Sequence, residues 1–206
     1  MSMILAFSGC GGSVPRTSVN PDETPSGIAI GGRFITGTGE TRAGSISVML
    51  RGEGGRERAV YRVPVDSQRP MVYALEPGKY ALSEPRSSLG SAQDRIRVEF
   101  DGRSYDAPFP RDFLRKPPVE LEAGKVLCLG AVEAKLISGL PGREPSLTIR
   151  LDDSFATRRE LLERLIKDMV DPSVPAQHRN NLLSWSRSLN RSFSELLAEE
   201  KKPTRP

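Results

Sequence analysis

The sequence predicts a mainly β protein, in which an antiparallel β-sandwich over residues 28–152 is followed by a C-terminal αα-hairpin over residues 153–200. Two observations lead to this fold class. Short runs in the first region alternate apolar and polar side chains between glycines and prolines, which is typical of half-buried strands. In the second region, apolar side chains recur every three or four residues, which is the period of an amphipathic helix.

The strands are predicted from runs spaced as in an all-β sandwich or barrel. The alternation is clearest in GSISVML at 44–50, RAVYRVPV at 58–65 and RIRVEFD at 95–101. Further strands are expected at IAIGGRFIT (28–36), PMVYAL (70–75), KYALS (79–83), PVELE (118–122), KVLCLGAVEAKLI (125–137) and SLTIRL (146–151). Together these runs amount to about nine strands, enough for two packed sheets.

Two of the predicted strands follow similar turns. LEPGKYAL at 75–82 and LEAGKVLCL at 121–129 both read as strand, Gly-Lys turn and strand, because glycine adopts the backbone conformation of a tight turn. A phosphate-binding loop needs Ser or Thr after Gly-Lys, which both copies lack. With these motifs, residues 43–151 resemble small bacterial envelope domains with a transthyretin-like or carboxypeptidase-regulatory-like β-sandwich. The resemblance implies an immunoglobulin-like sandwich in a binding or structural role, and it transfers no catalytic residue.

The N-terminus has the order of an export signal. The apolar run MILAF at 3–7 precedes Ser8, Gly9 and Cys10, and Phe7-Ser8-Gly9-Cys10 resembles the lipobox of bacterial lipoproteins. The resemblance implies a signal peptide over residues 1–9, cleavage after Gly9, and a lipid on the Cys10 thiol. Only nine residues precede Cys10 and none is Lys or Arg, so we expect the signal to be truncated.

A lipid on Cys10 would make the membrane a partner of this protein. Residues 10–27 are rich in glycine, serine, threonine and proline, and we expect them to form a flexible tether. Neither Gly11 nor Gly12 is acidic, which by analogy favours the outer membrane, with the domain facing the periplasm or the cell surface. No run approaches the roughly 20 apolar residues of a membrane-spanning helix.

The second cysteine, Cys128, lies in the apolar run VLCL at 126–129, where we expect it to behave as a small buried hydrophobe. If Cys10 is acylated, Cys128 has no partner for a disulfide within the chain. The alternative is a disulfide between Cys10 and Cys128 in a secreted protein without a lipid.

The C-terminal hairpin is predicted from capping residues and two apolar stripes. Asp152, Asp153 and Ser154 supply capping groups, and Thr157 with Glu160 fits a capping box. The first helix then ends at Asp171-Pro172, and a second is expected over residues 175–200, followed by a disordered tail over 201–206.

The stripe of the second helix contains Leu182, Trp185, Leu189, Phe193 and Leu196. The favoured interpretation is that it completes the core of the protein itself. The alternative is an interface for an envelope protein partner, with Trp185 and Phe193 as its anchors.

Composition and motifs favour a noncatalytic binding or structural protein. The net charge of +4 comes from 30 basic and 26 acidic residues spread along the chain, so we expect no nucleic-acid partner. No metal-ligating or cofactor-binding motif is present, so neither a metal nor a cofactor is expected. Two alternatives remain: a carrier of a small molecule or glycan, with a cavity in the sandwich, and a hydrolase using His178 or clustered carboxylates. His178, the single histidine, lies beside Arg179 and Asn180, so we expect it at the solvated surface.

Overall fold

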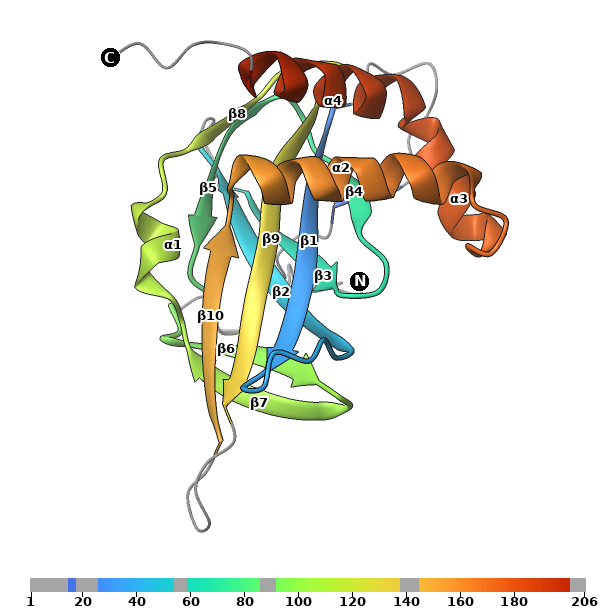
Figure 1. Cartoon of the computed structure of the whole chain (residues 1–206). Coiled ribbons are helices and arrows are strands. Elements are labelled where there is room, and N and C mark those ends of the chain that lie inside the picture. Colours follow the sequence, from blue (N-terminus) through green and yellow to red (C-terminus); the bar gives the residue numbers. More distant parts are fainter. Residues whose placement is uncertain (1–14, 18–25, 54–58, 86–91, 138–144, 201–206) are drawn as a thin grey trace, which may run out of the picture.

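The fold was determined from a computed structural model, which describes residues 15–17, 26–53, 59–85, 92–137 and 145–200 (Figure 1). The predicted signal peptide, Cys10, most of the tether and the 201–206 tail lie outside these residues.

The described chain forms two β-sheets and a C-terminal layer of helices. The strands are β1 (Gly27–Thr36), β2 (Gly44–Gly52), β3 (Val60–Asp66), β4 (Met71–Ala74), β5 (Gly78–Ser83), β6 (Arg95–Phe100), β7 (Arg103–Pro108), β8 (Val119–Leu121), β9 (Val126–Ile137) and β10 (Ser146–Asp152). The helices are α1 (Arg111–Arg115), α2 (Phe155–Val170), α3 (Ala176–Ser184) and α4 (Ser186–Glu200). The predicted mainly β fold with a C-terminal helical part is confirmed. Strand β7 and helix α1 were not predicted.

One sheet has four strands, which lie side by side in the order β10-β9-β1-β4. The other has six: five lie in the order β7-β6-β2-β5-β8, and β3 pairs with β2. Strand β2 pairs with β6 near its start and with β5 near its end, so these two strands share one edge of β2. Most pairs are antiparallel, as predicted, but β1 and β9 are parallel. This parallel pair, at the centre of the four-stranded sheet, is the one exception among the described strand pairs.

Two apolar cores hold the layers together. The larger core lies between the sheets and includes Phe34, Val63 and Phe100. The smaller core lies between the outer face of the four-stranded sheet and the helices, and includes Leu165 and Trp185. Figure 1 shows α2 crossing the faces of β9 and β1, with α4 running beside it. Helices α2, α3 and α4 thus form a third layer over part of the second face of this sheet.

The start of α2 differs from the predicted capping box. The Oγ of Ser154 accepts a hydrogen bond from the Thr157 backbone N–H at 3.3 Å, so Ser154 is the N-cap. The Thr157 hydroxyl donates to Asp152 at 2.7 Å. Thr157 is therefore inside the first turn, and Glu160 pairs with Arg33 of β1 at 3.1 Å instead of closing a box.

The predicted second helix is broken into α3 and α4. Trp185 ends α3 with φ −99° and ψ 0°, and α4 begins at the next residue. A Cβ on Gly27 would lie 2.8 Å from the Trp185 ring, so the indole packs directly against the backbone of β1. The hairpin is thus a three-helix unit that changes direction where its tryptophan enters the core.

A short piece of the predicted tether belongs to the folded domain. Pro15 is buried, and the Ala74 N–H of β4 donates to the carbonyl oxygen of Arg16 at 2.6 Å. The indole Nε1 of Trp185 donates to the carbonyl oxygen of Thr17 at 3.3 Å. The expectation that residues 10–27 form one flexible tether is therefore wrong at residues 15–17. It is also wrong at Ser26, which is buried, and at Gly27, where β1 begins.

Strand β9 contains a bulge where it pairs with β1. The β1–β9 register shifts between the pairs Ala29–Cys128 and Gly31–Ala131. Gly130, within this shift, has φ +92°, and a Cβ there would lie 2.1 Å from the carbonyl oxygen of Asp152. Because both the conformation and the close approach require glycine, this residue fixes how β9 passes the end of β10.

Candidate functional site

A cavity of about 330 Å³, which we call the inter-sheet cavity, opens between the two sheets. Its walls come from β2, β5 and β8 of the six-stranded sheet and from β9 and β10 of the other. The volume is at the lower end of the range for small-ligand sites, and the lining is mostly apolar, as in such sites. The apolar lining consists of Leu50, Tyr80, Leu82, Pro117, Val119, Leu127, Leu129 and Leu151, together with Cys128.

Three charged residues complete the lining of the inter-sheet cavity: Lys116, Asp153 and Arg158. Lys116, which follows α1, places its Nζ 2.5 Å from Asp153 Oδ2, at the junction of β10 and α2. Arg158 comes from the first turns of α2. Its terminal nitrogen lies 3.5 Å from Glu199 of α4, whereas its Nε is buried and has no hydrogen-bond partner among the described residues.

The Cys128 side chain is part of the cavity wall. It is partly buried and carries a free thiol, which donates to the carbonyl oxygen of Arg158 at 3.4 Å. Burial raises the pKa of this thiol to about 11, and the nearby Arg158 charge opposes the shift only in part. Cys128 therefore behaves as the predicted small hydrophobe. Cys10, its partner in the disulfide alternative, lies outside the described residues.

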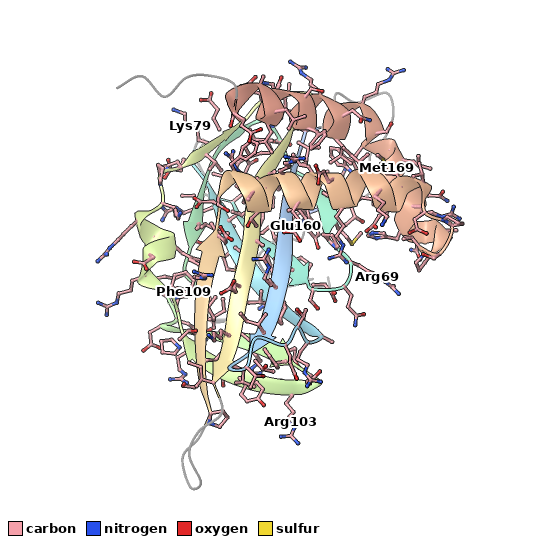
Figure 2. The ribbon with its side chains drawn as sticks, in the orientation of Figure 1. Arg69, Lys79, Arg103, Phe109, Glu160 and Met169 are labelled. Carbon is pink, nitrogen blue, oxygen red and sulfur yellow. The ribbon has the colours of Figure 1, made fainter. Side chains whose placement is uncertain are left out.

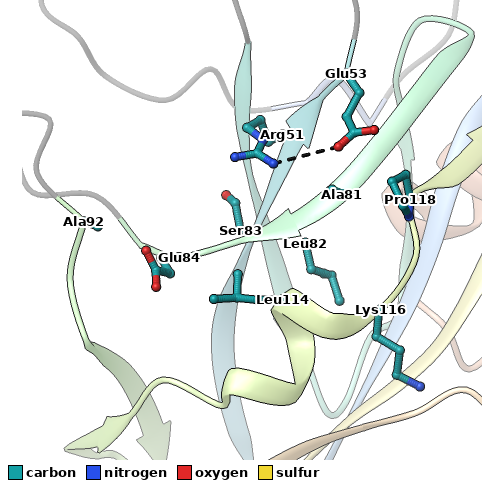
Figure 3. Close-up of a pocket in the computed structure, with 10 residues that line it drawn as sticks. All are labelled: Arg51, Glu53, Ala81, Leu82, Ser83, Glu84, Ala92, Leu114, Lys116 and Pro118. Carbon is teal, nitrogen blue, oxygen red and sulfur yellow. Dashed lines mark ion pairs between the residues drawn. The ribbon is translucent and has the colours of Figure 1, made fainter.

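A second, more polar pocket of about 370 Å³ adjoins the inter-sheet cavity (Figure 3). Leu82 and Lys116 line both spaces. Figure 3 shows Leu114 of α1 facing β5, with Arg51 and Glu53 paired at 3.8 Å farther along the pocket. The Ser83 hydroxyl is buried there without a hydrogen-bond partner among the described residues.

Clustered carboxylates occur where α2 crosses the four-stranded sheet. Arg33 of β1 lies within 4 Å of Glu133, Asp152 and Glu160, and Figure 2 labels Glu160 on α2 in front of the sheet. Glu133 is nearly buried and also pairs with Arg150 at 2.9 Å. A hydrogen bond from Thr157 holds the pKa of Asp152 below its usual range. These contacts join β1, β9, β10 and α2, so the cluster adds to the apolar packing that holds α2 on the sheet.

His178 is not at the solvated surface, and that prediction is wrong. It is 7% exposed, and its Nε2 lies 3.9 Å from Asp168 Oδ2 on α2. Burial lowers its pKa, Asp168 opposes this shift, and Arg69 and Arg164 add to it. Its polar neighbours in sequence gave no sign that α3 packs this residue against α2.

The predicted partner anchors lie in and beside the protein's own core. Trp185 is 1% exposed, and Phe193 is partly buried against the same cluster. The favoured interpretation of the stripe as core is therefore confirmed, and Trp185 offers no surface to a partner in this conformation.

Sequence reasoning found Cys128 but missed the three charged residues of the inter-sheet cavity. Asp153 was predicted only as a capping residue, and neither Lys116 nor Arg158 was singled out from the sequence. No local pattern marks them, because only the packing of α1 and α2 beside the sheets brings them together.

Within the described ranges of the chain, no three His, Cys, Asp or Glu side chains are grouped so that they could hold a metal ion. Among the described helices, none combines the length and the apolar character needed to cross a membrane. In the three comparisons with known proteins, no family model, curated protein or solved structure matches this chain.

Proposed function

We propose that this protein is a noncatalytic lipoprotein of the bacterial cell envelope, anchored through a lipid on Cys10 to the outer membrane and facing the periplasm or the cell surface. The observation that carries the proposal is the order of the N-terminus, in which an apolar run and Ser8-Gly9-Cys10 come just before a folded domain. The domain then acts by binding or as a structural element.

The packing of residues 15–17 refines this proposal. Pro15 is buried in the domain, and only residues 11–14 separate it from Cys10. Five Cα-to-Cα steps span at most about 18 Å at the maximal extension of a chain. An anchor on Cys10 would therefore hold the sandwich close to the bilayer, rather than at the end of a long tether.

Labelling with palmitate tests the anchor. The gene with its native upstream region is expressed in a bacterial host with labelled palmitate, beside the variants Cys10→Ala and Cys128→Ala. We expect label and a mature chain beginning at acylated Cys10 in the wild type and in Cys128→Ala, and no label in Cys10→Ala. An unlabelled wild-type chain that retains Met1 would refute the proposal.

The inter-sheet cavity favours a second role that is compatible with the anchor, the carrying of a small molecule. A largely apolar space with a few charged groups is typical of ligand sites. A glycan fits this space poorly, because Tyr80 is the one aromatic side chain among the described residues of the lining, and its hydroxyl already donates to the Glu76 carbonyl at 2.6 Å.

A further inference from the structure

We infer that the inter-sheet cavity binds a linear monocarboxylate, with its hydrocarbon chain among the leucines and its carboxylate at Arg158. This inference rests on the carrier role proposed for the cavity and is independent of the lipid on Cys10.

The apolar lining of the cavity favours a ligand with a hydrocarbon part. Leu50 and Tyr80 project from the six-stranded sheet, and Leu129 and Leu151 come from the other. These side chains offer no hydrogen bond, apart from the Tyr80 hydroxyl, which is already occupied. A ligand that fills this space must therefore place a hydrocarbon part there, since buried polar groups without partners are strongly unfavourable.

Arg158 has a hydrogen-bond donor without an acceptor in the described part of the chain. This residue lines the cavity, and its Nε is buried with no hydrogen-bond partner among the described residues. The Arg158 side chain is 29% exposed and pairs with Glu199, but its buried Nε–H is left without an acceptor among these residues, which is unfavourable. A carboxylate is the acceptor that a guanidinium binds best. The Glu199 carboxylate contacts a different nitrogen of Arg158 and is half exposed, so it leaves Nε free.

The charged residues of the lining favour an anionic ligand. Lys116 and Asp153 neutralise each other through a 2.5 Å contact, and Glu199, which pairs with Arg158 at 3.5 Å, is not part of the described lining, so the net charge of the lining itself is positive. An anionic head group is attracted to this lining, whereas a cationic one of the same length is repelled. The cavity chemistry thus selects the sign of the head group as well as the hydrocarbon chain.

The test uses decanoate as the probe and the full chain with Cys10→Ser, so that Cys128 is its one remaining cysteine. Binding is measured by calorimetry, and the site is identified by protection of the Cys128 thiol from iodoacetamide at pH 9. Decyltrimethylammonium, with the same chain and a positive head group, is the ligand control. Arg158→Gln is compared with Arg159→Gln, which alters a neighbouring arginine that pairs with Glu163 on the surface of α2.

We expect saturable decanoate binding that protects Cys128, at least tenfold weaker binding in Arg158→Gln, and unchanged binding in Arg159→Gln. Val119→Trp should fill the cavity and abolish binding, while Val170→Trp, at a residue 74% exposed, should not. Urea unfolding of each variant is measured to check that it is folded.

The possible results distinguish the carboxylate site from the carrier role and from the lipid on Cys10. If decyltrimethylammonium binds as tightly as decanoate, or if Arg158→Gln binds like the wild type, the carboxylate site is refuted and an apolar carrier remains. If neither amphiphile binds or protects Cys128, the carrier role itself fails. Neither result bears on palmitate labelling of Cys10, which is measured separately.

Discussion

The indole N–H of Trp185 donates a hydrogen bond to the carbonyl oxygen of Thr17, across 168 positions of the sequence. The same ring packs against Gly27 and is 1% exposed. One side chain thus joins the N-terminal segment, the first strand and the break between α3 and α4. The helices and residues 15–17 are therefore parts of one packed unit.

Replacing this tryptophan tests that unit. Trp185→Phe keeps an aromatic ring but removes the N–H and the outer ring, so we expect the free energy of unfolding to fall by roughly 2 kcal/mol. Urea unfolding followed by circular dichroism measures the change. Leu183→Ala is the control, because Leu183 is 49% exposed, and a change of no more than about 0.5 kcal/mol is expected there. Equal losses in the two variants would contradict the packing.

The bulge in β9 should make the protein sensitive to substitution of Gly130. Gly130 and Gly39 both have positive φ, but a Cβ on Gly39 meets nothing within 4 Å, whereas one on Gly130 would lie 2.1 Å from the Asp152 carbonyl oxygen. Gly39→Ala therefore adds only backbone strain, of roughly 1 kcal/mol. Gly130→Ala adds strain and displaces β10, so we expect it to lower the stability by at least about 3 kcal/mol. Thermal and urea unfolding compare the two, and similar losses would refute the close approach.

The Cys128 thiol should react slowly and with a steep pH dependence. Burial raises its pKa to about 11, so the thiolate is roughly a hundredfold scarcer at pH 8 than for a thiol with the ordinary pKa of 9.0. In the Cys10→Ser chain, we expect alkylation by iodoacetamide to accelerate about tenfold per pH unit between pH 8 and pH 10. The urea-unfolded chain is the control and should react about a hundredfold faster at pH 8. A folded-state rate that does not change with pH would contradict the burial of this thiol.

Protonation of His178 should destabilise the protein. Burial lowers its pKa in the folded state, so below about pH 6.5 the unfolded chain binds more protons at this residue. Its contribution to stability is complete above about pH 6.5 and is lost as the pH falls through the folded-state pKa. Arg69 and Arg164 strengthen this effect, and Asp168 weakens it.

The measurement is urea unfolding from about pH 7.5 to about pH 5, in the wild type and in His178→Gln. Since the chain has one histidine, the difference between the two curves isolates its titration from that of the carboxylates. We expect the stability of the wild type to fall more steeply toward low pH than that of His178→Gln. Parallel curves would show that the packing of α3 leaves this histidine unperturbed.

Local periodicity accounts for most of what could be predicted from the sequence. Runs such as GSISVML at 44–50 alternate clearly enough to locate strands, and the leucines of α2 locate a helix. The parallel pairing of β1 with β9 has no local signal, because strand pairing depends on distant segments. Likewise, nothing near Trp185 shows that the helix must break there, and the polar neighbours of His178 conceal its burial.

The inter-sheet cavity was beyond sequence reasoning for the same cause. Cys128 could be assigned to an apolar environment from its neighbours alone. Lys116 and Arg158 line the same cavity only because α1 and α2 both pack beside the sheets. A side chain whose role depends on tertiary contacts carries no signal in its own segment.

The parallel pairing of β1 with β9 also sets how much of the chain must be made before the four-stranded sheet can form. Gly27 pairs with Val126, so the partner of the first strand emerges roughly 5–20 s later at the usual elongation rates. Until then, of its two neighbours in the sheet, β1 can reach only the short strand β4. The helices that cover this sheet are made later still. β1 is thus without its central partner for about half of the synthesis of the chain, and the four-stranded sheet depends on a contact of long sequence separation, which slows folding.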